Sequence, residues 1–207
     1  MSNPSHVAER YVIAISGGSG SGKSTLADAL VSEIGSPFAT VLTVDAYYHD
    51  LAHLSLTERE RTNFDHPDAL DLALFEQHVL ALRRGQTIQR PCYDFETHCR
   101  QAQTAVIIPR KWIIVEGILV AATASLRALY DQVIYVEADR TVRWQRRLQR
   151  DQRDRGRDDA SIARFWARAE ETFMTQGSIA SQYADLILSG EQTLDVNVRR
   201  IMRVIAT

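Results

Sequence analysis

An octapeptide near the start of the chain carries residue types that bind phosphate. Residues 17–24 read Gly-Gly-Ser-Gly-Ser-Gly-Lys-Ser and fit the pattern G-x-x-x-x-G-K-[ST] of a P-loop. In such a loop, backbone N–H groups surround phosphate oxygens, the lysine reaches the outer phosphates, and the final hydroxyl faces a metal ion. We therefore expect a nucleoside triphosphate to bind there. The predicted contacts are Gly17, Gly18, Ser19, Gly20, Ser21, Gly22, Lys23, Ser24 and Thr25.

The lysine of this loop is unusual for the chain. Of 24 basic residues only Lys23 and Lys111 are lysines, and all the others are arginines. A compact ammonium group fits between phosphates better than a planar guanidinium does. The use of lysine at this position therefore supports the phosphate-binding interpretation over a chance Gly/Ser turn.

The elements on either side of the loop support the same interpretation. Residues 11–15 form a short apolar run typical of a buried strand, and residues 23–34 carry apolar side chains at helical spacing up to a stop at Gly35 and Pro37. A strand, a glycine loop and a helix in this order direct a helix N-terminus at an anion.

Acidic residues follow three predicted strands. Asp45, Glu116 and Glu137 come directly after apolar runs, and ligands of open α/β sheets bind beyond the carboxyl ends of strands. Asp45 and Glu116 could therefore face the same triphosphate, one organising Mg²⁺ with Ser24 and one accepting a proton from an acceptor alcohol. The alternative for each acid is a helix N-cap, which is strongest for Glu137.

Seven arginines lie between residues 143 and 157, interleaved with aspartates such as Asp151 and Asp154. For most of them a solvated face of ion pairs is the better interpretation. The segment Arg155-Gly156-Arg157 instead suggests a loop that brings cations over phosphates, as a lid in phosphoryl transfer would.

The whole chain predicts one α/β domain over residues 1–207, with a five-stranded parallel sheet of the P-loop NTPase type and helices on both faces. Residues 86–109 look like a hairpin that leaves this body. The predicted strands are Tyr11–Ile15, Thr40–Val44, Trp112–Val115, Val133–Val136 and Ala184–Leu188. The predicted helices are Lys23–Ile34, Ala69–Arg84, Ala124–Tyr130, Thr141–Arg153, Ala160–Thr175 and Leu194–Val204.

Composition excludes several other classes. A net charge of −2 gives no field for nucleic acid or an anionic membrane, and no apolar run reaches the length of a membrane span. Cys92 and Cys99 form no disulfide framework, and with His98 they lack the paired spacing of a metal site. We expect a cytoplasmic protein.

The motifs also separate the classes of P-loop protein. The chain contains neither the Asp-x-x-Gly nor the Asn-Lys-x-Asp sequence that a GTPase switch would carry. A motor would usually need a longer chain. A small-molecule kinase remains, since the candidate acceptor base has no use in a binding module that does not turn over.

Five segments resemble the uridine kinases (uridine–cytidine kinases) in order and spacing. They are residues 45–48, 63–71, 91–100, 116–119 and 146–157, and the stretch Asn-Phe-Asp-His-Pro-Asp at 63–68 is far more specific than the P-loop. The resemblance implies transfer of the γ-phosphoryl group of ATP, or of GTP, to the 5′-hydroxyl of uridine or cytidine with Mg²⁺. It also suggests a homotetramer.

The resemblance further implies roles for individual residues. Asp45 would be the catalytic base close to Mg²⁺, with Ser24 and Glu116 completing the metal environment. Substrate contacts would be Asp65 and Tyr48 at the ribose, Tyr93 and His98 at the pyrimidine edge, and Phe95 and Ile118 on the faces of the base. The clamp on phosphate and ribose would be Arg147, Arg150, Arg155 and Arg157.

The chain departs from this pattern after residue 158. The family usually has Gln-Tyr where Phe165-Trp166 stands here, and the glutamine is in many members a ribose or lid contact. Sugar recognition or lid closure could differ, with Trp166 packing its helix onto the sheet. A kinase for another ribosyl or sugar alcohol, of the nicotinamide riboside or phosphoribulose type, is the alternative function. A nucleotide-binding regulator without turnover is the third.

Overall fold

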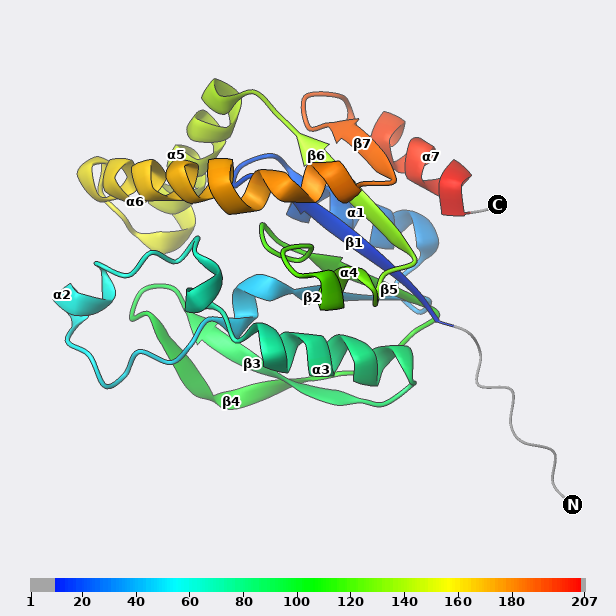
Figure 1. Cartoon of the computed structure of the whole chain (residues 1–207), viewed down its shortest axis with the longest axis horizontal. Helices are drawn as coiled ribbons and strands as arrows, with labels where there is room; N and C mark the ends of the chain where they lie inside the picture. Colours follow the sequence, from blue (N-terminus) through cyan, green and yellow to red (C-terminus); the bar gives the residue numbers. More distant parts are fainter. Residues whose placement is uncertain (1–9, 206–207) are drawn as a thin grey trace, which may run out of the picture.

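The computed structural model describes residues 10–205 and contains one parallel sheet of five strands in the order β2-β5-β1-β6-β7 (Figure 1). The strands are β1 Tyr11–Gly17, β2 Ala39–Thr43, β5 Trp112–Glu116, β6 Gln132–Glu137 and β7 Leu186–Ser189. Each corresponds to one predicted strand, so the predicted fold class is confirmed. The predicted domain includes residues 1–9, 206 and 207, which lie outside the described residues.

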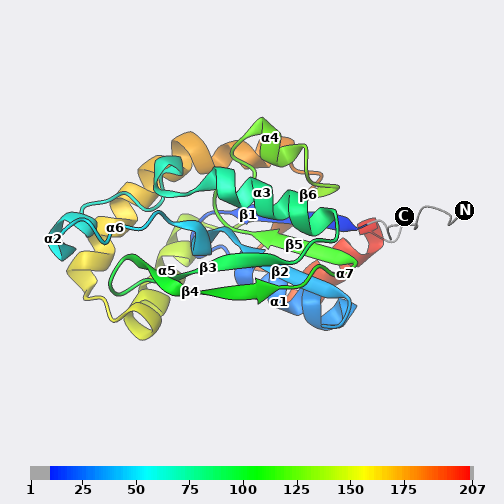
Figure 2. The same cartoon turned by 90° about the horizontal axis from the view of Figure 1, so that it is seen from below.

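Alternation along the strands sends side chains into two separate cores. Val12 and Ala14 of β1 face the helices α3 (Leu72–Arg83) and α4 (Ala124–Arg127). Ile13 and Ile15 face α1 (Lys23–Ile34) and α7 (Leu194–Ile205). Because both faces are covered, the strands are apolar throughout rather than alternating in polarity. Figure 2 shows the two helical layers on opposite sides of the sheet.

The helices agree with prediction best where their ends are encoded locally. Their bounds are α1 Lys23–Ile34, α2 Leu56–Arg59, α3 Leu72–Arg83, α4 Ala124–Arg127, α5 Arg140–Arg155, α6 Asp159–Thr172 and α7 Leu194–Ile205. α3 begins later than predicted because the Asp71 side chain accepts a hydrogen bond from Leu74 N and caps the helix there. α4 is a single turn, and α6 ends at Thr172 in a π-helical turn at Phe173–Gly177.

The predicted hairpin is present. β3 Ile88–Asp94 pairs antiparallel with β4 Cys99–Ile107, and the register shifts between Pro91 and Tyr93. In Figure 1 the hairpin lies beside α3, at the rim of the molecule. Its tip, at residues 94–99, therefore reaches the same end of the molecule as the turn between α5 and α6.

Two long helices form that turn. α5 ends at Gly156, whose φ of 59° is left-handed, and α6 starts with an N-cap at Asp158.

In the part of the chain that the structure describes, no helix is both long and apolar enough to cross a membrane.

Candidate active site

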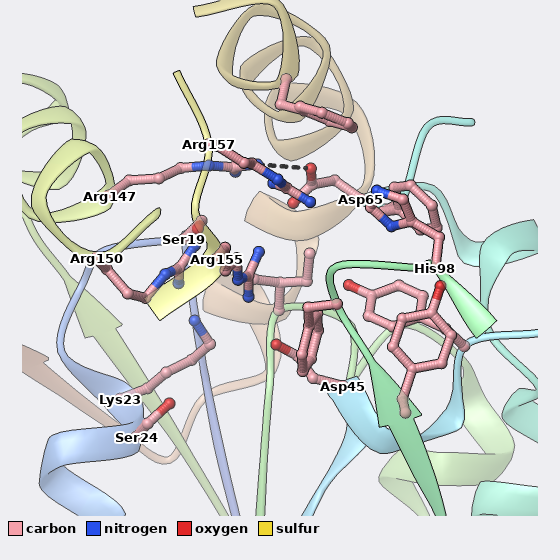
Figure 3. A pocket seen from close by; sticks show the side chains of 16 residues that line it. Ser19, Lys23, Ser24, Asp45, Asp65, His98, Arg147, Arg150, Arg155 and Arg157 are labelled. Carbon is pink, nitrogen blue, oxygen red and sulfur yellow. Dashed lines mark hydrogen bonds and ion pairs between the residues drawn. The ribbon is translucent and has the colours of Figure 1, made fainter. Parts of the chain in front are cut away.

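A cavity lies at the carboxyl end of the sheet, between the P-loop, the hairpin tip and the α5–α6 turn (Figure 3). It brings together nearly all the side chains that the sequence predicts for substrate and catalysis. The predicted residues that line it are Ser19, Lys23, Ser24, Asp45, Tyr48, Asp65, Tyr93, Phe95, His98, Ile118, Arg147, Arg150, Arg155 and Arg157. These residues come from segments spread over most of the chain, so the fold itself assembles the site.

The P-loop joins β1 to the N-terminus of α1. Gly20 has a φ of 80°, and a Cβ at this position would collide with the Arg143 backbone. α5 therefore packs directly on the loop and holds its shape. Arg146 strengthens this packing, since its guanidinium lies within 3.5 Å of the carbonyl oxygens of Gly20 and Ser21.

Lys23 is only 8% exposed, and its Nζ donates a hydrogen bond of 3.3 Å to the Gly18 carbonyl oxygen. Burial lowers the pKa of this ammonium, and the neighbouring carboxylates of Glu116 and Asp45 act in the opposite direction. In Figure 3 the Lys23 side chain points into the cavity towards Arg150. A cation so placed is available to phosphate oxygens.

Two carboxylates lie near Lys23 and Ser24, at the end of the loop. Glu116 ends β5 and accepts a hydrogen bond of 2.9 Å from Ser24 Oγ, while Asp45 lies in the turn that follows β2. Burial, and then the negative charge of Asp45, raise the pKa of Glu116. Two carboxylates that destabilise each other, together with a hydroxyl, are a donor set suited to Mg²⁺.

The metal would need further ligands. Within residues 10–205 no cluster of three or more His, Cys, Asp or Glu side chains could hold an ion by itself. Mg²⁺ commonly binds one or two carboxylates and takes its remaining ligands from phosphates and water. The donor set found here fits that mode.

The far end of the cavity is aromatic. His98 stacks on Phe64, with ring centroids 4.5 Å apart and an interplanar angle of 15°, and Tyr48 packs against Tyr93 at 5.1 Å. Burial, then the charges of Arg157 and Arg155, lower the pKa of His98 to about 4. The imidazole is therefore neutral near pH 7 and can both donate and accept a hydrogen bond.

Several polar groups in the cavity still have bonding capacity. The Tyr93 hydroxyl and Arg147 Nη1 are buried without a hydrogen-bond partner, and Arg147 Nη2 lies 3.5 Å from Asp65 Oδ2. Buried polar groups without partners are costly unless a ligand supplies the bonds. The pocket therefore has free hydrogen-bonding groups beside stacked rings.

The prediction of a solvated ion-pair face on α5 is wrong for several of its residues. Arg143, Arg147 and Asp151 are buried, and Arg143 forms a two-point ion pair with Glu170 of α6 at 2.6 and 3.0 Å. The sequence pattern of α5 does not indicate this burial, because the groups that cover this face of the helix belong to other segments, α6 and the P-loop.

Two residues of the cavity were not predicted as site residues. Phe64 and Phe165 both line it, and the guanidinium of Arg157 lies 4.2 Å from the centre of the Phe165 ring. Phe165 lies where the sequence departs from the uridine-kinase pattern, and this departure was the signal that could have marked it as a site residue. Trp166 packs against Trp144 of α5, with ring centroids 5.5 Å apart.

A second cavity opens on the other side of the P-loop. It extends from Gly22 and Thr25 to Gly190 and Asn197, with Arg146 and Arg150 along one side. Lys23, Ser24 and Arg150 border both cavities. A nucleotide in the second cavity would thus direct its phosphates towards the first.

A P-loop at the carboxyl end of a parallel sheet, two carboxylates near it and several arginines around the same cavity define a phosphotransferase of the P-loop kinase class, which uses a nucleotide as phosphoryl donor. The sequence model of the "Phosphoribulokinase / Uridine kinase family" matches residues 12–197. The chain belongs to this family, and the predicted resemblance is confirmed.

Individual relatives agree. A uridine kinase of Alkaliphilus metalliredigens is 37% identical over 198 residues, covering 93% of this chain and 95% of that protein. A uridine kinase of Clostridium tetani is 39% identical over 178 residues, covering 86% and 85%. A solved structure from Silicibacter sp. TM1040, described as a candidate fructose transport system kinase, superposes with a TM-score of 0.67 at 25% identity and covers 90% of this chain and 92% of that one.

Proposed function

We propose that the protein phosphorylates the 5′-hydroxyl of uridine and cytidine with ATP or GTP, forming UMP and CMP for pyrimidine salvage. The observation that carries the proposal is one cavity that runs from Lys23 and Asp45 to the aromatic pocket of Tyr93 and His98. Relatives named uridine kinase, similar over more than four-fifths of the chain, support it.

In the proposed reaction Asp45 is the general base. Its carboxylate accepts the proton of the 5′-hydroxyl while that oxygen forms a bond to the γ-phosphorus. The bond from the γ-phosphorus to the bridging oxygen breaks, and the electron pair leaves with the nucleoside diphosphate. Lys23, Arg147 and Arg150 compensate charge on the transferring group.

Mg²⁺, when bound, would neutralise phosphate charge and fix the donor's geometry. We assign its protein contacts to Ser24, Glu116 and Asp45. The Ser24–Glu116 hydrogen bond orients the hydroxyl for this task before a nucleotide arrives.

An uncharged nucleoside must be recognised by stacking and by hydrogen bonds whose loss is costly. We assign Asp65 and Tyr48 to the ribose, Tyr93 and neutral His98 to the pyrimidine edge, and Phe95 and Ile118 to its faces. Arg155 and Arg157 close the pocket over both ribose and phosphate.

One observation favours a second candidate function. Phe165, which lines the cavity, offers no hydrogen bond at the position where the uridine-kinase pattern usually has glutamine. A kinase for a different ribosyl or sugar alcohol would be consistent with this loss. It would need different groups at Tyr93 and His98 or added basic residues, and neither is evident in the sequence.

A substrate panel tests the proposal. ADP release from Mg²⁺-ATP would be measured with uridine, cytidine, 2′-deoxyuridine, adenosine, nicotinamide riboside, ribulose 5-phosphate and fructose. Turnover confined to uridine and cytidine supports the proposal, and repeating the assay with GTP defines the donor. Activity on another acceptor, without activity on either pyrimidine, would replace uridine and cytidine as substrates and leave the kinase class standing.

We also propose a cytoplasmic location, which the two free cysteines support, and a homotetramer, as the family resemblance implies. Light scattering coupled to size-exclusion chromatography measures the assembly. A monomer at micromolar concentration would contradict the tetramer.

A further inference from the structure

Asp151 is a fully buried carboxylate that the proposed reaction does not use. It lies in the last part of α5 and is 0% exposed. Its Oδ1 accepts hydrogen bonds from Arg150 Nη2 at 2.7 Å and Nε at 2.9 Å, and its Oδ2 accepts one from Arg157 Nη1 at 3.2 Å. Arg147 Nε and Arg155 Nε are each 3.7 Å from the same carboxylate. All four arginines proposed for the lid and clamp therefore converge on one side chain.

The backbone of Asp151 holds the same turn. Its carbonyl oxygen accepts hydrogen bonds from the N–H groups of Gly156 and Arg157. The residue thus fixes the chain that carries Arg155 and Arg157 as well as their guanidinium groups. An asparagine in this place would keep the backbone bonds but lose the charge and one of the two accepting oxygens.

Charge balance explains why a carboxylate is needed there. Four guanidinium groups close together repel one another, and within the cavity lining only Asp65 and Asp45 add negative charge near them. Burial by itself would raise the pKa of Asp151, but Arg155, Arg150 and Arg147 hold it below its usual range. Asp151 is therefore ionised at neutral pH, and its single charge leaves the arginines with excess positive charge for phosphates.

Two of the arginines also form part of the aromatic pocket. Arg155 lies 4.5 Å from the centre of the Phe95 ring, and Arg157 lies 4.2 Å from that of Phe165. The same two guanidinium groups also contact the Asp151 carboxylate. The carboxylate thus links the phosphate side of the cavity to its aromatic side.

We propose that Asp151 is a positioning residue that assembles the lid arginines before a nucleotide binds, and that donor phosphates take over part of its role afterwards. The benefit is preorganisation, because cations already in place need no rearrangement when charge develops in the transition state. The inference rests on the proposed kinase reaction, but its main readout does not depend on the acceptor.

The test compares Asp151→Asn with Asp154→Asn. Asp154 is three residues further along α5, and its carboxylate pairs only with the exposed Arg153 among the ion pairs of the described chain. Hydrogen exchange of residues 150–158 would be measured without ligand and with Mg²⁺ and a non-hydrolysable ATP analogue. For Asp151→Asn we expect at least about tenfold faster exchange without ligand, corresponding to 1.4 kcal/mol of lost local stability, and recovery when the analogue binds.

Kinetics supply the second readout. We expect Asp151→Asn to lower kcat by about 100-fold, as misplaced catalytic groups do, with a smaller change in the KM for the nucleoside. Asp151→Glu, which keeps the charge, should recover much of the rate, while Asp154→Asn, whose carboxylate forms no ion pair with the four arginines, should have a much smaller effect than Asp151→Asn. These ratios are taken on whichever acceptor the wild type uses, so failure of the proposed substrate and failure of this inference are distinguishable.

Three results would overturn the inference. The first is that Asp151→Asn matches Asp154→Asn in hydrogen exchange and in rate. The second is that the faster exchange of Asp151→Asn extends over the whole chain and is not reversed by the ATP analogue. The third is that Asp151→Glu is no more active than Asp151→Asn. Should Asp151→Asn fail to fold, the wild type alone decides. Slow exchange of residues 150–158 without nucleotide supports a preassembled lid, and fast exchange there refutes it.

Discussion

Ser24 Oγ donates a hydrogen bond of 2.9 Å to Glu116 Oε2, which joins the first turn of α1 to the last residue of β5. The P-loop and the neighbouring strand are therefore connected through the two groups that we assign to Mg²⁺. Glu116 also pairs in register with Ile15 of β1, so the sheet fixes the carboxylate relative to the loop.

This relationship predicts the metal dependence of the enzyme. Glu116→Gln should raise the Mg²⁺ concentration needed for half-maximal rate by about 10- to 100-fold, because a ligand charge and an orienting acceptor are lost. A magnesium titration of the initial rate measures it. Glu171→Gln, on the exposed side of α6, is the control. An unchanged magnesium requirement in Glu116→Gln would remove Glu116 from the metal site.

The pKa of Glu116 adds a pH dependence. Because this pKa is raised above the ordinary 4.5, the carboxyl holds its proton to a higher pH than in the unfolded chain. A metal ion must displace that proton, so apparent Mg²⁺ affinity should fall as pH decreases towards and below this pKa. Calorimetry in two buffers of different ionisation enthalpy would detect the released proton. Mg²⁺ binding that releases no proton at pH values near and below the pKa of Glu116 would contradict the prediction.

Asp45→Asn tests the assigned base. The amide keeps the shape but cannot accept the hydroxyl proton, so kcat should fall by about 100- to 10,000-fold, while ATP affinity changes little. Steady-state kinetics and a nucleotide-binding titration measure the two effects separately. Asp195→Asn, at an exposed position of α7, should leave both unchanged. Near-normal turnover in Asp45→Asn would exclude the assignment.

His98 should act as a neutral imidazole. Its pKa of about 4 predicts no inflection near pH 6.5 in the KM for the nucleoside. His98→Ala should mainly raise that KM. Since the backbone of His98 has a φ of 55°, His98→Asn, which tolerates this conformation, separates loss of the ring from backbone strain. An unchanged KM in both variants would make His98 structural.

The lowered pKa of His98 also makes the stability of the folded protein depend on pH. Between about pH 4 and 6.5 the unfolded chain binds more protons at His98 than the folded protein does. Stability should therefore fall as the pH decreases through this window, and His98→Asn should reduce that slope. Thermal unfolding at a series of pH values measures it. Identical slopes in the two proteins would contradict the burial of a neutral ring.

Phe165→Leu tests the departure from the family pattern. Leucine keeps an apolar group of similar size, so the cost in stability should stay below about 1.5 kcal/mol. Loss of the ring under Arg157 should raise the KM for the nucleoside about three- to tenfold. Met174→Ala, at an exposed position, is the control. A KM equal to that of the wild type would make Phe165 a packing residue.

The sequence was sufficient for features that are encoded locally. The apolar strands, the glycine loop and the helix stop at Gly35 depend on neighbours in the chain, and the sheet and α1 follow the prediction closely. The order of strands, by contrast, follows from pairings such as β1 with β6, which no local pattern specifies.

The cavity residues were predictable mainly through motif spacing, whereas burial on α5 was not. Arg143 pairs with Glu170, which is 27 residues away, and Asp151 is covered by arginines that fold back from the following turn. Read along the helix, these residues look like an exposed mixture of charges. Phe165 became a site residue only when α6 was placed against the hairpin tip.

The stacking of Arg155 on Phe95 and of Arg157 on Phe165 joins the arginines that we assign to the phosphates to the wall of the aromatic pocket. Neither can open without disturbing the other. In the proposed reaction, entry of the acceptor and exclusion of bulk water would then be parts of a single event, and the arrangement would limit wasteful hydrolysis of the donor when no acceptor is bound.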